Sequence, residues 1–540
     1  MCLLAAAAAA GCLPAGAPPA GQQLVADRTA MLAGILPPTG DGLTRVLFTR
    51  PGPNPQPDNP NARTSDLYVV SVGANGGPPS ERLLAAAMPG VIAFPCAQGQ
   101  SICFQSDARG RVFVTTALDP STGQNVVERI DPVTGDRLDA NNGGYYLSPS
   151  GRRLIVYKAS DRLGSVAGFT LYEIDDRATV VDGTSSGVFI GEDEDVYYVT
   201  AQQELARIPP GGTPEVLATG VSAFSMLGPA NTVLVLGRPT AADPTVSTLS
   251  VFDSATRQET PYPFGGVTPF VGSEVTASPD GRWLLDVAAS SDFTAANFTL
   301  VDRVTGAEEV FQRPFSFVNF QWRPRRAELW IGSAQTDDPT IWIKTPGGAA
   351  IAISGSPFGL YEASNPSQPT SGFFTPDGAY WFDATVGSTG AFLDISVGSA
   401  DDPAGPRFDL APLNEILLNY WQLADGRILM PTYKKVATRS DIYAFDPATG
   451  DARLLGEAGG VTAVGQTRLL AILHVIDQAG DLNAIDLASS RSTVLAPEFT
   501  LSAFVAPQDG DRVAPGAHVA YQFQARFASP YDGIWVATVP

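Results

Sequence analysis

The stretch that decides the fold runs from Glu274 to Phe311 and reads EVTASPDGRWLLDVAASSDFTAANFTLVDRVTGAEEVF. Two turn phrases divide it, SPDGR at residues 278–282 and DRVTG at residues 302–306. Gly, Pro, Asp and Ser are the residues that tight turns prefer, and β-branched and aromatic residues flank both phrases. The apolar residues follow no helical period. The pattern predicts four short antiparallel strands, at residues 274–277, 282–288, 296–302 and 307–311.

Both turn phrases recur along the chain. The first returns as SPSGR at residues 148–152 and TPDG at residues 375–378, and the second as DPVTGD at residues 131–136 and DPATGD at residues 446–451. Ten strand ends between Ser71 and Asp486 lie about 46 residues apart on average. A repeat of this length holds four short strands and their turns, which is one blade of a β-propeller. The sequence therefore predicts an all-β propeller.

The two phrases resemble those of the TolB-type, WD-like propeller family, whose blades carry an S-P-D-G-(R/K) turn and a D-x-x-T-G turn. The resemblance covers most of residues 44–540, although the Trp-Asp dipeptide of true WD repeats does not occur in the chain. Because the shared residues form turns, the resemblance implies a fold and transfers no active site.

The repeat count predicts about ten to eleven blades. Propellers usually close with four to eight blades. We therefore expect two propellers, one over residues 41–260 with about five blades and one over residues 261–540 with about six. The Pro- and Gly-rich segment at residues 261–266 is the candidate junction between them. One large ring is the alternative.

The last blade stops after its third strand, at residues 533–540. Residues 13–40, rich in Ala, Gly and Pro at their start, are expected to form a flexible tether. Within them, Gln23–Ala26 or Met31–Leu36 is the candidate for the missing strand, which would close the edge of the sheet.

Residues 1–12 resemble the signal of a bacterial lipoprotein. A short apolar run ends in Ala9-Ala10-Gly11-Cys12, and small residues before a cysteine are typical of a lipobox. By this resemblance Cys12 carries the lipid, and the protein is exported to the periplasm or cell surface, where it touches a bacterial membrane through that anchor only. The run is too short to span a bilayer. No basic residue precedes it, so either the true start lies upstream or the segment is no signal.

Two cysteines remain once Cys2 and Cys12 are assigned to the N-terminal segment. Cys96 and Cys103 lie seven residues apart, a span that lets the chain bend back and bring their sulfur atoms together. We predict a disulfide between them in an oxidising compartment. Two buried free thiols are the alternative.

Composition excludes several classes of function. The formal net charge of −21 argues against a nucleic-acid partner, because phosphate binding needs a basic surface. Two histidines cannot supply a multi-histidine metal site. We expect no cofactor. Thirty arginines stand against four lysines, which we interpret as the mark of a GC-rich genome.

Two sequence motifs that resemble a catalytic or a metal site have simpler explanations. GTSSG at residues 183–187 matches the G-x-S-x-G nucleophile elbow, but a strand follows where that motif needs a helix, so we interpret it as chance. The acidic run at residues 192–195 includes Asp193 and Asp195, which are weak candidates for binding Ca²⁺, and a solvated turn is the alternative. No catalytic residue is assigned.

Two further features are typical of binding surfaces. Trp322, Trp381 and Trp421 are candidates for an exposed aromatic surface that captures carbohydrate or peptide, although blade cores also need large side chains. A proline-rich stretch between the first two strands that follow the tether is a candidate binding loop, and a tolerated surface insertion is the alternative. Its candidate residues are Pro53, Asn54, Pro55, Pro57 and Asp58.

These observations predict an envelope-anchored β-propeller that binds a protein or glycan partner without catalysis. The alternative is a propeller-type enzyme, a lyase or glycoside hydrolase, that acts with carboxylates on one face of the propeller. An enzyme should bring several carboxylates and an arginine together in a deep pocket, where their pKa values are raised.

Overall fold

A computed structural model provides the structure of the chain. It describes residues 22–52, 64–73, 79–89, 104–118, 125–141, 145–148, 150–159, 166–173, 177–182, 189–190, 193–227, 232–240, 247–264, 273–289, 295–314, 318–333, 340–355, 360–362, 370–386, 393–410, 416–417, 419–434, 439–457, 459–476, 479–505, 513–524 and 531–540. Within these ranges all regular structure is β-strand, so the all-β prediction is confirmed. No described segment forms a helix that is long and apolar enough to cross a membrane.

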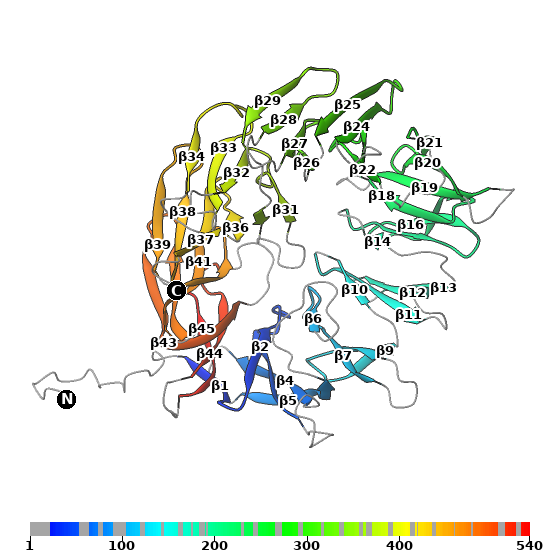
Figure 1. Ribbon diagram of the computed structural model, residues 1–540. Helices are drawn as coiled ribbons and strands as arrows, with labels where there is room; N and C mark the ends of the chain where they lie inside the picture. Colours follow the sequence, from blue (N-terminus) through cyan, green and yellow to red (C-terminus); the bar gives the residue numbers. More distant parts are fainter. Residues whose placement is uncertain are drawn as a thin grey trace, which may run out of the picture.

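The strands form eleven four-stranded blades in a ring, a β-propeller (Figure 1). In each of the first seven blades the strands pair antiparallel in chain order, and the first strand lies nearest the centre of the ring. Seven blades are separate four-stranded sheets, and the remaining four depart from this pattern. The propeller predicted from the turn phrases is therefore confirmed.

The strands of the seven separate blades follow one another in chain order. They are β2 (Met31–Ile35), β3 (Leu43–Pro51), β4 (Thr64–Gly73), β5 (Ser80–Pro89); β6 (Phe104–Ser106), β7 (Val112–Leu118), β8 (Asn125–Ile130), β9 (Arg137–Asn141); β10 (Tyr145–Leu147), β11 (Arg153–Ala159), β12 (Val166–Glu173), β13 (Ala178–Asp182); β14 (Phe189–Ile190), β15 (Val196–Val199), β16 (Glu204–Ile208), β17 (Glu215–Thr219); β18 (Ala223–Met226), β19 (Val233–Pro239), β20 (Ser247–Asp253), β21 (Gln258–Pro261); β22 (Ser273–Ala277), β23 (Trp283–Ala289), β24 (Ala295–Asp302), β25 (Glu308–Pro314); and β26 (Val318–Trp322), β27 (Leu329–Ser333), β28 (Thr340–Lys344), β29 (Ala350–Ser354).

The last four blades are less regular than the first seven, and the tenth and eleventh share one strand. They contain β30 (Leu360–Glu362), β31 (Thr370–Gly372), β32 (Tyr380–Val386), β33 (Leu393–Ser399), β34 (Arg407–Asp409); β35 (Ile416–Leu417), β36 (Asn419–Gln422), β37 (Ile428–Lys434), β38 (Arg439–Phe445), β39 (Ala452–Gly456); β40 (Gly460–Val464), β41 (Arg468–Ile476), β42 (Ala479–Asp486), β43 (Ser492–Val505); and β44 (His518–Phe523), β45 (Gly533–Thr538), β1 (Gln23–Asp27). The long strand β43 pairs with β42 through its first half and with β44 through its second half. It is therefore the outer strand of the tenth blade and the inner strand of the eleventh.

Local hydrogen bonds explain both turn phrases in the sixth blade. In the first phrase the hydroxyl of Ser278 accepts from the Trp283 N–H at 2.9 Å, and Gly281 adopts a φ of +68°, which favours glycine. In the second phrase Asp302 Oδ1 accepts from the Val304 N–H at 2.8 Å. The first phrase joins the first two strands of a blade and the second joins the last two. Because the strands alternate in direction, both kinds of turn lie on the same face of the ring.

The N-terminal strand closes the ring. β1 pairs antiparallel with β45 as the outermost strand of the eleventh blade, in a register that sets Gln23 opposite Val536 and Asp27 opposite Gly533. Of the two candidates for the missing strand, residues 23–26 are therefore the correct one. Met31–Ile35 instead forms the first strand of the first blade. Residues 23–27 and 31–35, which the predicted tether included, thus belong to the ring.

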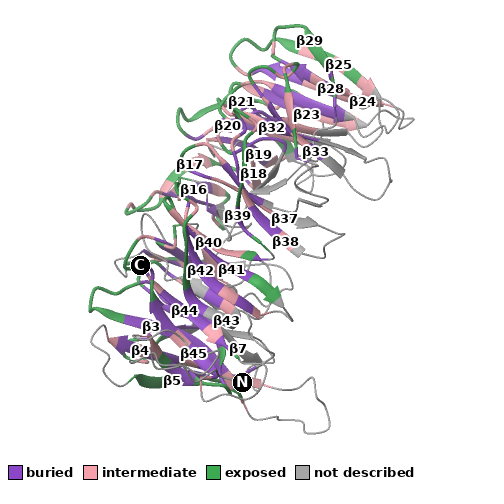
Figure 2. Cartoon of the chain, turned by 90° about the vertical axis from the view of Figure 1, so that its left-hand side faces the viewer, coloured by how far each residue is buried: buried purple, intermediate pink, exposed green. Residues whose placement is uncertain are grey.

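The apolar core is divided among the interfaces between blades. Among the described residues, one cluster of buried apolar side chains lies between each pair of neighbouring blades. One of these clusters joins the first and last blades, through residues such as Phe48 and Ile534. In Figure 2 the buried residues follow the strands, whereas exposed residues lie in the turns and on outer strands such as β29.

One large ring, the alternative to two propellers, fits this arrangement. The predicted junction begins at Pro261, where the fifth blade ends. Across it, Val233 and Val235 of the fifth blade pack against Ala277 and Leu284 of the sixth, as neighbouring blades do elsewhere in the ring.

Arginines link neighbouring blades. Arg153 of the third blade donates to the Ile208 carbonyl of the fourth at 3.0 Å, and Arg323 of the seventh donates to the Gly378 carbonyl of the eighth at 2.8 Å. Arg427 of the ninth blade donates to the Leu487 carbonyl of the tenth at 3.2 and 3.1 Å. A planar guanidinium carries five N–H donors, whereas a lysine ammonium is a compact point charge. These three arginines therefore have a structural role.

Candidate functional site

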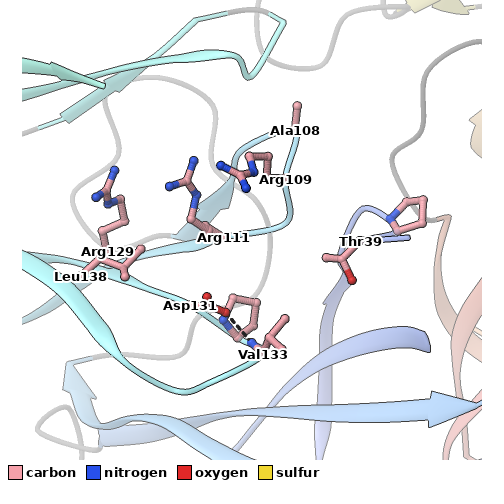
Figure 3. Close-up of a pocket in the computed structure, with 10 residues that line it drawn as sticks. Thr39, Ala108, Arg109, Arg111, Arg129, Asp131, Val133 and Leu138 are labelled. Carbon is pink, nitrogen blue, oxygen red and sulfur yellow. Dashed lines mark hydrogen bonds between the residues drawn. The ribbon is translucent and has the colours of Figure 1, made fainter. Parts of the chain in front are cut away.

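A cavity of about 570 Å³ lies between the turns of the first and second blades (Figure 3). The loop between β2 and β3 forms one side, and the two turns of the second blade form the other. Its lining residues are Pro38, Thr39, Ala108, Arg109, Arg111, Arg129, Asp131, Pro132, Val133 and Leu138. Three arginines from one blade thus face a single cavity in a chain whose net charge is −21.

The turn between β6 and β7 positions two of these arginines. Asp107 Oδ1 accepts from the backbone N–H groups of Arg109 at 3.0 Å and Arg111 at 2.9 Å, which closes the turn. Asp107 Oδ2 accepts from Arg111 Nε at 2.7 Å. Gly110 adopts a φ of +77°, and a Cβ there would lie 3.2 Å from the Pro37 carbonyl oxygen. Glycine at this position therefore allows the loop of the first blade to lie against the turn.

Arg129 belongs to β8 and is 8% exposed. Its guanidinium lies over the ring of Tyr172 in the third blade, 3.9 Å from the ring centroid. Such a cation–π contact is strongest where water is excluded. The side chain is therefore held from the third blade while it lines the cavity between the first and second.

Asp131, the acidic residue that lines the cavity, accepts hydrogen bonds within its own turn. Asp131 Oδ1 accepts from the Val133 N–H at 2.7 Å and from the Thr134 N–H at 3.3 Å. In the corresponding turn of the sixth blade, Asp302 also accepts from Arg282 Nη2 at 2.7 Å, and this contact holds the pKa of the Asp302 carboxyl well below its usual range. In the second blade the corresponding arginine, Arg111, bonds to Asp107 instead, and its side chain lines the cavity.

A much smaller cavity on the far side of the same arginines lies between the second and third blades. Arg111 and Arg129 line both cavities, and Tyr172 and Glu173 line the smaller one. Glu173 is already paired with Arg153, at 2.7 Å from Arg153 Nη2. The two buried arginines, Arg111 and Arg129, therefore separate the larger cavity from the smaller one.

Guanidinium groups converging on a cavity can bind an oxyanion, since each presents a planar fork of N–H donors. Of the described residues that line the cavity, none is a histidine, cysteine or glutamate. The arrangement therefore suits recognition of a negatively charged group.

The three candidate tryptophans do not form a shared surface. Trp381 is fully buried and packs on Trp330 with their ring centroids 5.2 Å apart. Trp322 is 8% exposed and belongs to the core between the sixth and seventh blades. Trp421 is half-buried against the core between the ninth and tenth blades. These positions correct the prediction of an aromatic surface, because the blade interfaces take up the large side chains.

The acidic candidates for Ca²⁺ do not converge. Asp195 is buried and pairs with Arg207 Nη1 at 3.0 Å, while Asp193 is exposed and accepts from the Asp195 N–H at 3.1 Å. Burial raises the pKa of Asp195, against the lowering effect of Arg207. No group of three or more possible metal ligands occurs among the residues that the structure describes.

Several predicted site residues lie outside the described residues. They are the lipidation candidate Cys12, the cysteines Cys96 and Cys103, the loop residues Pro53, Asn54, Pro55, Pro57 and Asp58, and the GTSSG motif at residues 183–187.

Sequence reasoning missed Arg109, Arg111 and Arg129, although a signal for the first two is present. The turn Asp107-Ala108-Arg109-Gly110-Arg111 is an altered copy of the SPDGR phrase. Arg109 stands where the sixth blade has Asp280, which reverses the charge at that position of the turn. A comparison of the blades with one another, position by position, would have revealed this reversal.

No protein-family model matches the chain, and no curated protein matches it. Solved structures are similar at low identity. The β-propeller domain of the Trilobed protease from Pyrococcus furiosus is 10% identical, covers 64% of this chain and 93% of its own, and superposes with a TM-score of 0.28. A eukaryotic initiation factor is 10% identical, covers 69% and 90%, and has a TM-score of 0.39. Oligogalacturonate lyase from Vibrio parahaemolyticus is 13% identical, covers 82% and 99%, and has a TM-score of 0.25.

The class of this protein therefore rests on its own strand pairing and core. It is an eleven-bladed β-propeller, closed by its N-terminal strand, with an arginine-lined cavity between its first two blades.

Proposed function

We propose that the protein is an envelope-anchored β-propeller that binds a partner without catalysis, and that the arginine-lined cavity is its binding site. The observation that carries this proposal is the convergence of Arg109, Arg111 and Arg129 on one cavity of about 570 Å³. Loops and turns on a rigid ring build the cavity, which is the usual way in which scaffolds present binding residues.

The enzyme alternative has less support. A lyase or glycoside hydrolase needs two or more groups that transfer protons at the reacting bond. Asp131 is the one carboxylate among the described lining residues, and two backbone N–H groups already bond to it. The cavity therefore favours binding over proton transfer.

The proposed cellular location follows from the resemblance of residues 1–12 to a lipoprotein signal. We place the propeller in the periplasm or at the cell surface, held through a lipid on Cys12. Because the proposed compartment is oxidising, it favours the predicted disulfide between Cys96 and Cys103.

Replacement of Cys12 tests the proposed membrane anchor. Cys12→Ala removes the proposed lipid site, so the variant is expected to move from the membrane fraction to the soluble envelope fraction, because one short apolar run alone does not anchor a chain. The measurement is fractionation of cells followed by immunoblotting, with Cys2→Ala as the matched control. An unchanged membrane fraction for Cys12→Ala would contradict the anchor.

Affinity capture tests the binding role. The tagged Cys12→Ala protein is incubated with an extract of its own cell envelope, and we expect it to retain a partner that the double variant Arg109→Gln/Arg129→Gln releases. The variant Arg282→Gln alters the same kind of turn in the sixth blade and should retain the partner. Equal retention by all three proteins would show that binding does not use the cavity, and depolymerised glycan in the extract would favour the enzyme.

A further inference from the structure

We propose that the outer edge of β29, in the seventh blade, is a docking surface for a second copy of this chain. The two β29 strands pair antiparallel around a two-fold axis and join two blades into one continuous sheet. This inference goes beyond the proposed binding function, because it does not use the arginine-lined cavity.

β29 is the end strand of its sheet. It pairs antiparallel with β28 along Ala350–Ser354, and no other strand that the structure describes pairs with its second edge. A strand at the edge of a sheet presents backbone N–H and C=O groups that can pair with another chain. Four of the five residues are exposed, and only Ile353 is buried, in the core between the seventh and eighth blades (Figure 2).

The edge of β29 lacks the protection that the other outer strands have. Proteins usually place charged residues or prolines on exposed edge strands, and these residues prevent pairing with other chains. Each of the other outer strands contains at least one charged residue, namely β5, β9, β13, β17, β21, β25, β34, β39, β43 and β1. Among the outer strands that the structure describes, β29 alone has neither a charge nor a proline. In the sequence, no charged residue occurs from Thr345 to Tyr361.

Ile351 supplies the apolar part of this surface. Its side chain is 58% exposed, although isoleucine is among the residue types most often buried. A two-fold axis beside Ile351 sets this side chain opposite its own copy, and such β-branched pairs stabilise a sheet. The pairing then spans residues 349–353. Ser354 lies outside it, since its carbonyl already accepts from Arg407 of the eighth blade.

Charge and symmetry favour a second copy as the occupant. Two chains of net charge −21 repel each other, so they approach most easily where the local surface is neutral. Just before β29, Lys344 forms an ion pair with Glu309 of the sixth blade, so these two charges cancel. A two-fold axis makes an antiparallel edge its own complement, and one contact then closes both exposed edges.

The contact is small. A five-residue edge buries much less surface than the roughly 1,200–2,000 Å² of a stable interface, so we expect a weak and reversible dimer. Salt should strengthen it, because salt screens the repulsion between the two acidic chains. A dimer held by ion pairs would show the opposite dependence on salt.

Sedimentation velocity of the full chain carrying Cys12→Ala tests the inference. We expect a dimer that grows with protein concentration, and that grows further as salt rises from about 0.1 M to about 1 M. Ile351→Lys sets two like charges opposite each other at the axis, so it should weaken dimerisation at least about tenfold. The matched control is Val310→Lys. Val310 is 62% exposed on β25, the charged outer strand of the sixth blade, and this change should have no effect.

Cysteine cross-linking measures the register in a variant that carries no added charge. Directly opposed residues of an antiparallel pair have Cβ atoms about 4.5–5.5 Å apart, close enough for a disulfide after a small shift. Ile351→Cys should therefore yield a covalent dimer under mild oxidation, on a gel run without reducing agent. Val310→Cys, with the same native cysteines, should stay monomeric.

A chain that stays monomeric at every concentration and salt would overturn the inference, as would equal weakening by Ile351→Lys and Val310→Lys. Species that grow beyond a dimer would also overturn it, because a two-fold axis closes. If the parent chain is monomeric and Ile351→Lys releases the captured envelope partner, the edge binds a foreign strand and the second copy is rejected. Loss of the dimer leaves the cavity intact, so affinity capture with the arginine variants tests the proposed function separately.

Discussion

Deletion of residues 1–27 is expected to lower the free energy of unfolding by about 4 kcal/mol and to make the protein self-associate. The deletion removes β1 and leaves all four strands of the first blade in place. Val25 and Ala26 are buried in the core that joins the first and last blades, and full burial of one valine contributes about 1.5–3 kcal/mol. Each hydrogen bond of the lost ladder adds about 1 kcal/mol.

Self-association has a separate cause. Without β1, the backbone of β45 is left as an exposed sheet edge, which can pair with another chain. We expect a lower urea midpoint and a larger species in size-exclusion chromatography. The experiment monitors both for the deletion of residues 1–27.

The matched control is deletion of residues 1–20. It keeps Gln22, whose side-chain amide donates to the Leu495 carbonyl at 2.5 Å and whose side-chain carbonyl accepts from Tyr521, together with all of β1. This shorter deletion should leave both the midpoint and the size unchanged. If removal of β1 has no more effect than the control, the N-terminal strand does not close the ring.

Arg153→Ala is expected to lower the free energy of unfolding by about 3–5 kcal/mol, the usual effect of breaking a buried ion pair. The side chain is 1% exposed. It donates to Glu173 Oε1 at 2.7 Å within its own blade, and to the carbonyls of Ile208 at 3.0 Å and Pro209 at 3.3 Å in the next blade. Its removal leaves the buried Glu173 carboxylate and the buried Ile208 carbonyl without this donor.

Arg152→Ala is the matched control, one residue away on the same turn. Arg152 is exposed, so its loss should change the free energy of unfolding by less than about 0.5 kcal/mol. Adding Glu173→Gln to Arg153→Ala removes the stranded charge and should restore part of the loss. Urea unfolding monitored by tryptophan fluorescence measures all three proteins. Similar midpoints for Arg152→Ala and Arg153→Ala would show that the arginine does not hold the two blades together.

Much of the fold could be predicted from short phrases. Strands predicted at residues 274–277, 282–288, 296–302 and 307–311 correspond to β22, β23, β24 and β25 within a few residues. This worked because each turn is made by its own residues, as when Ser278 and Asp302 bond to backbone groups within five positions along the chain. The same reasoning about an incomplete blade predicted a closing strand at residues 23–26 or 31–36, and the strand pairing identifies the first of the two.

Little of the candidate site could be predicted in this way. Thr39, Arg109 and Arg129 are far apart in the sequence, and they meet because two blades pack side by side with their turns on one face. The three tryptophans, by contrast, are visible in the sequence and predicted an exposed surface, but large aromatic side chains also fill cores, and these three pack between blades.

The sequence by itself determined the blade, its strands and turns, and a number of repeats near eleven, because these depend on hydrogen bonds and residue preferences within a few positions of the chain. Only the tertiary structure decided that the blades share one large ring and that three arginines line one cavity. Both depend on how whole sheets pack: ring closure needs residues 23–27 beside residues 533–536, and the cavity needs turns of two separate blades in contact.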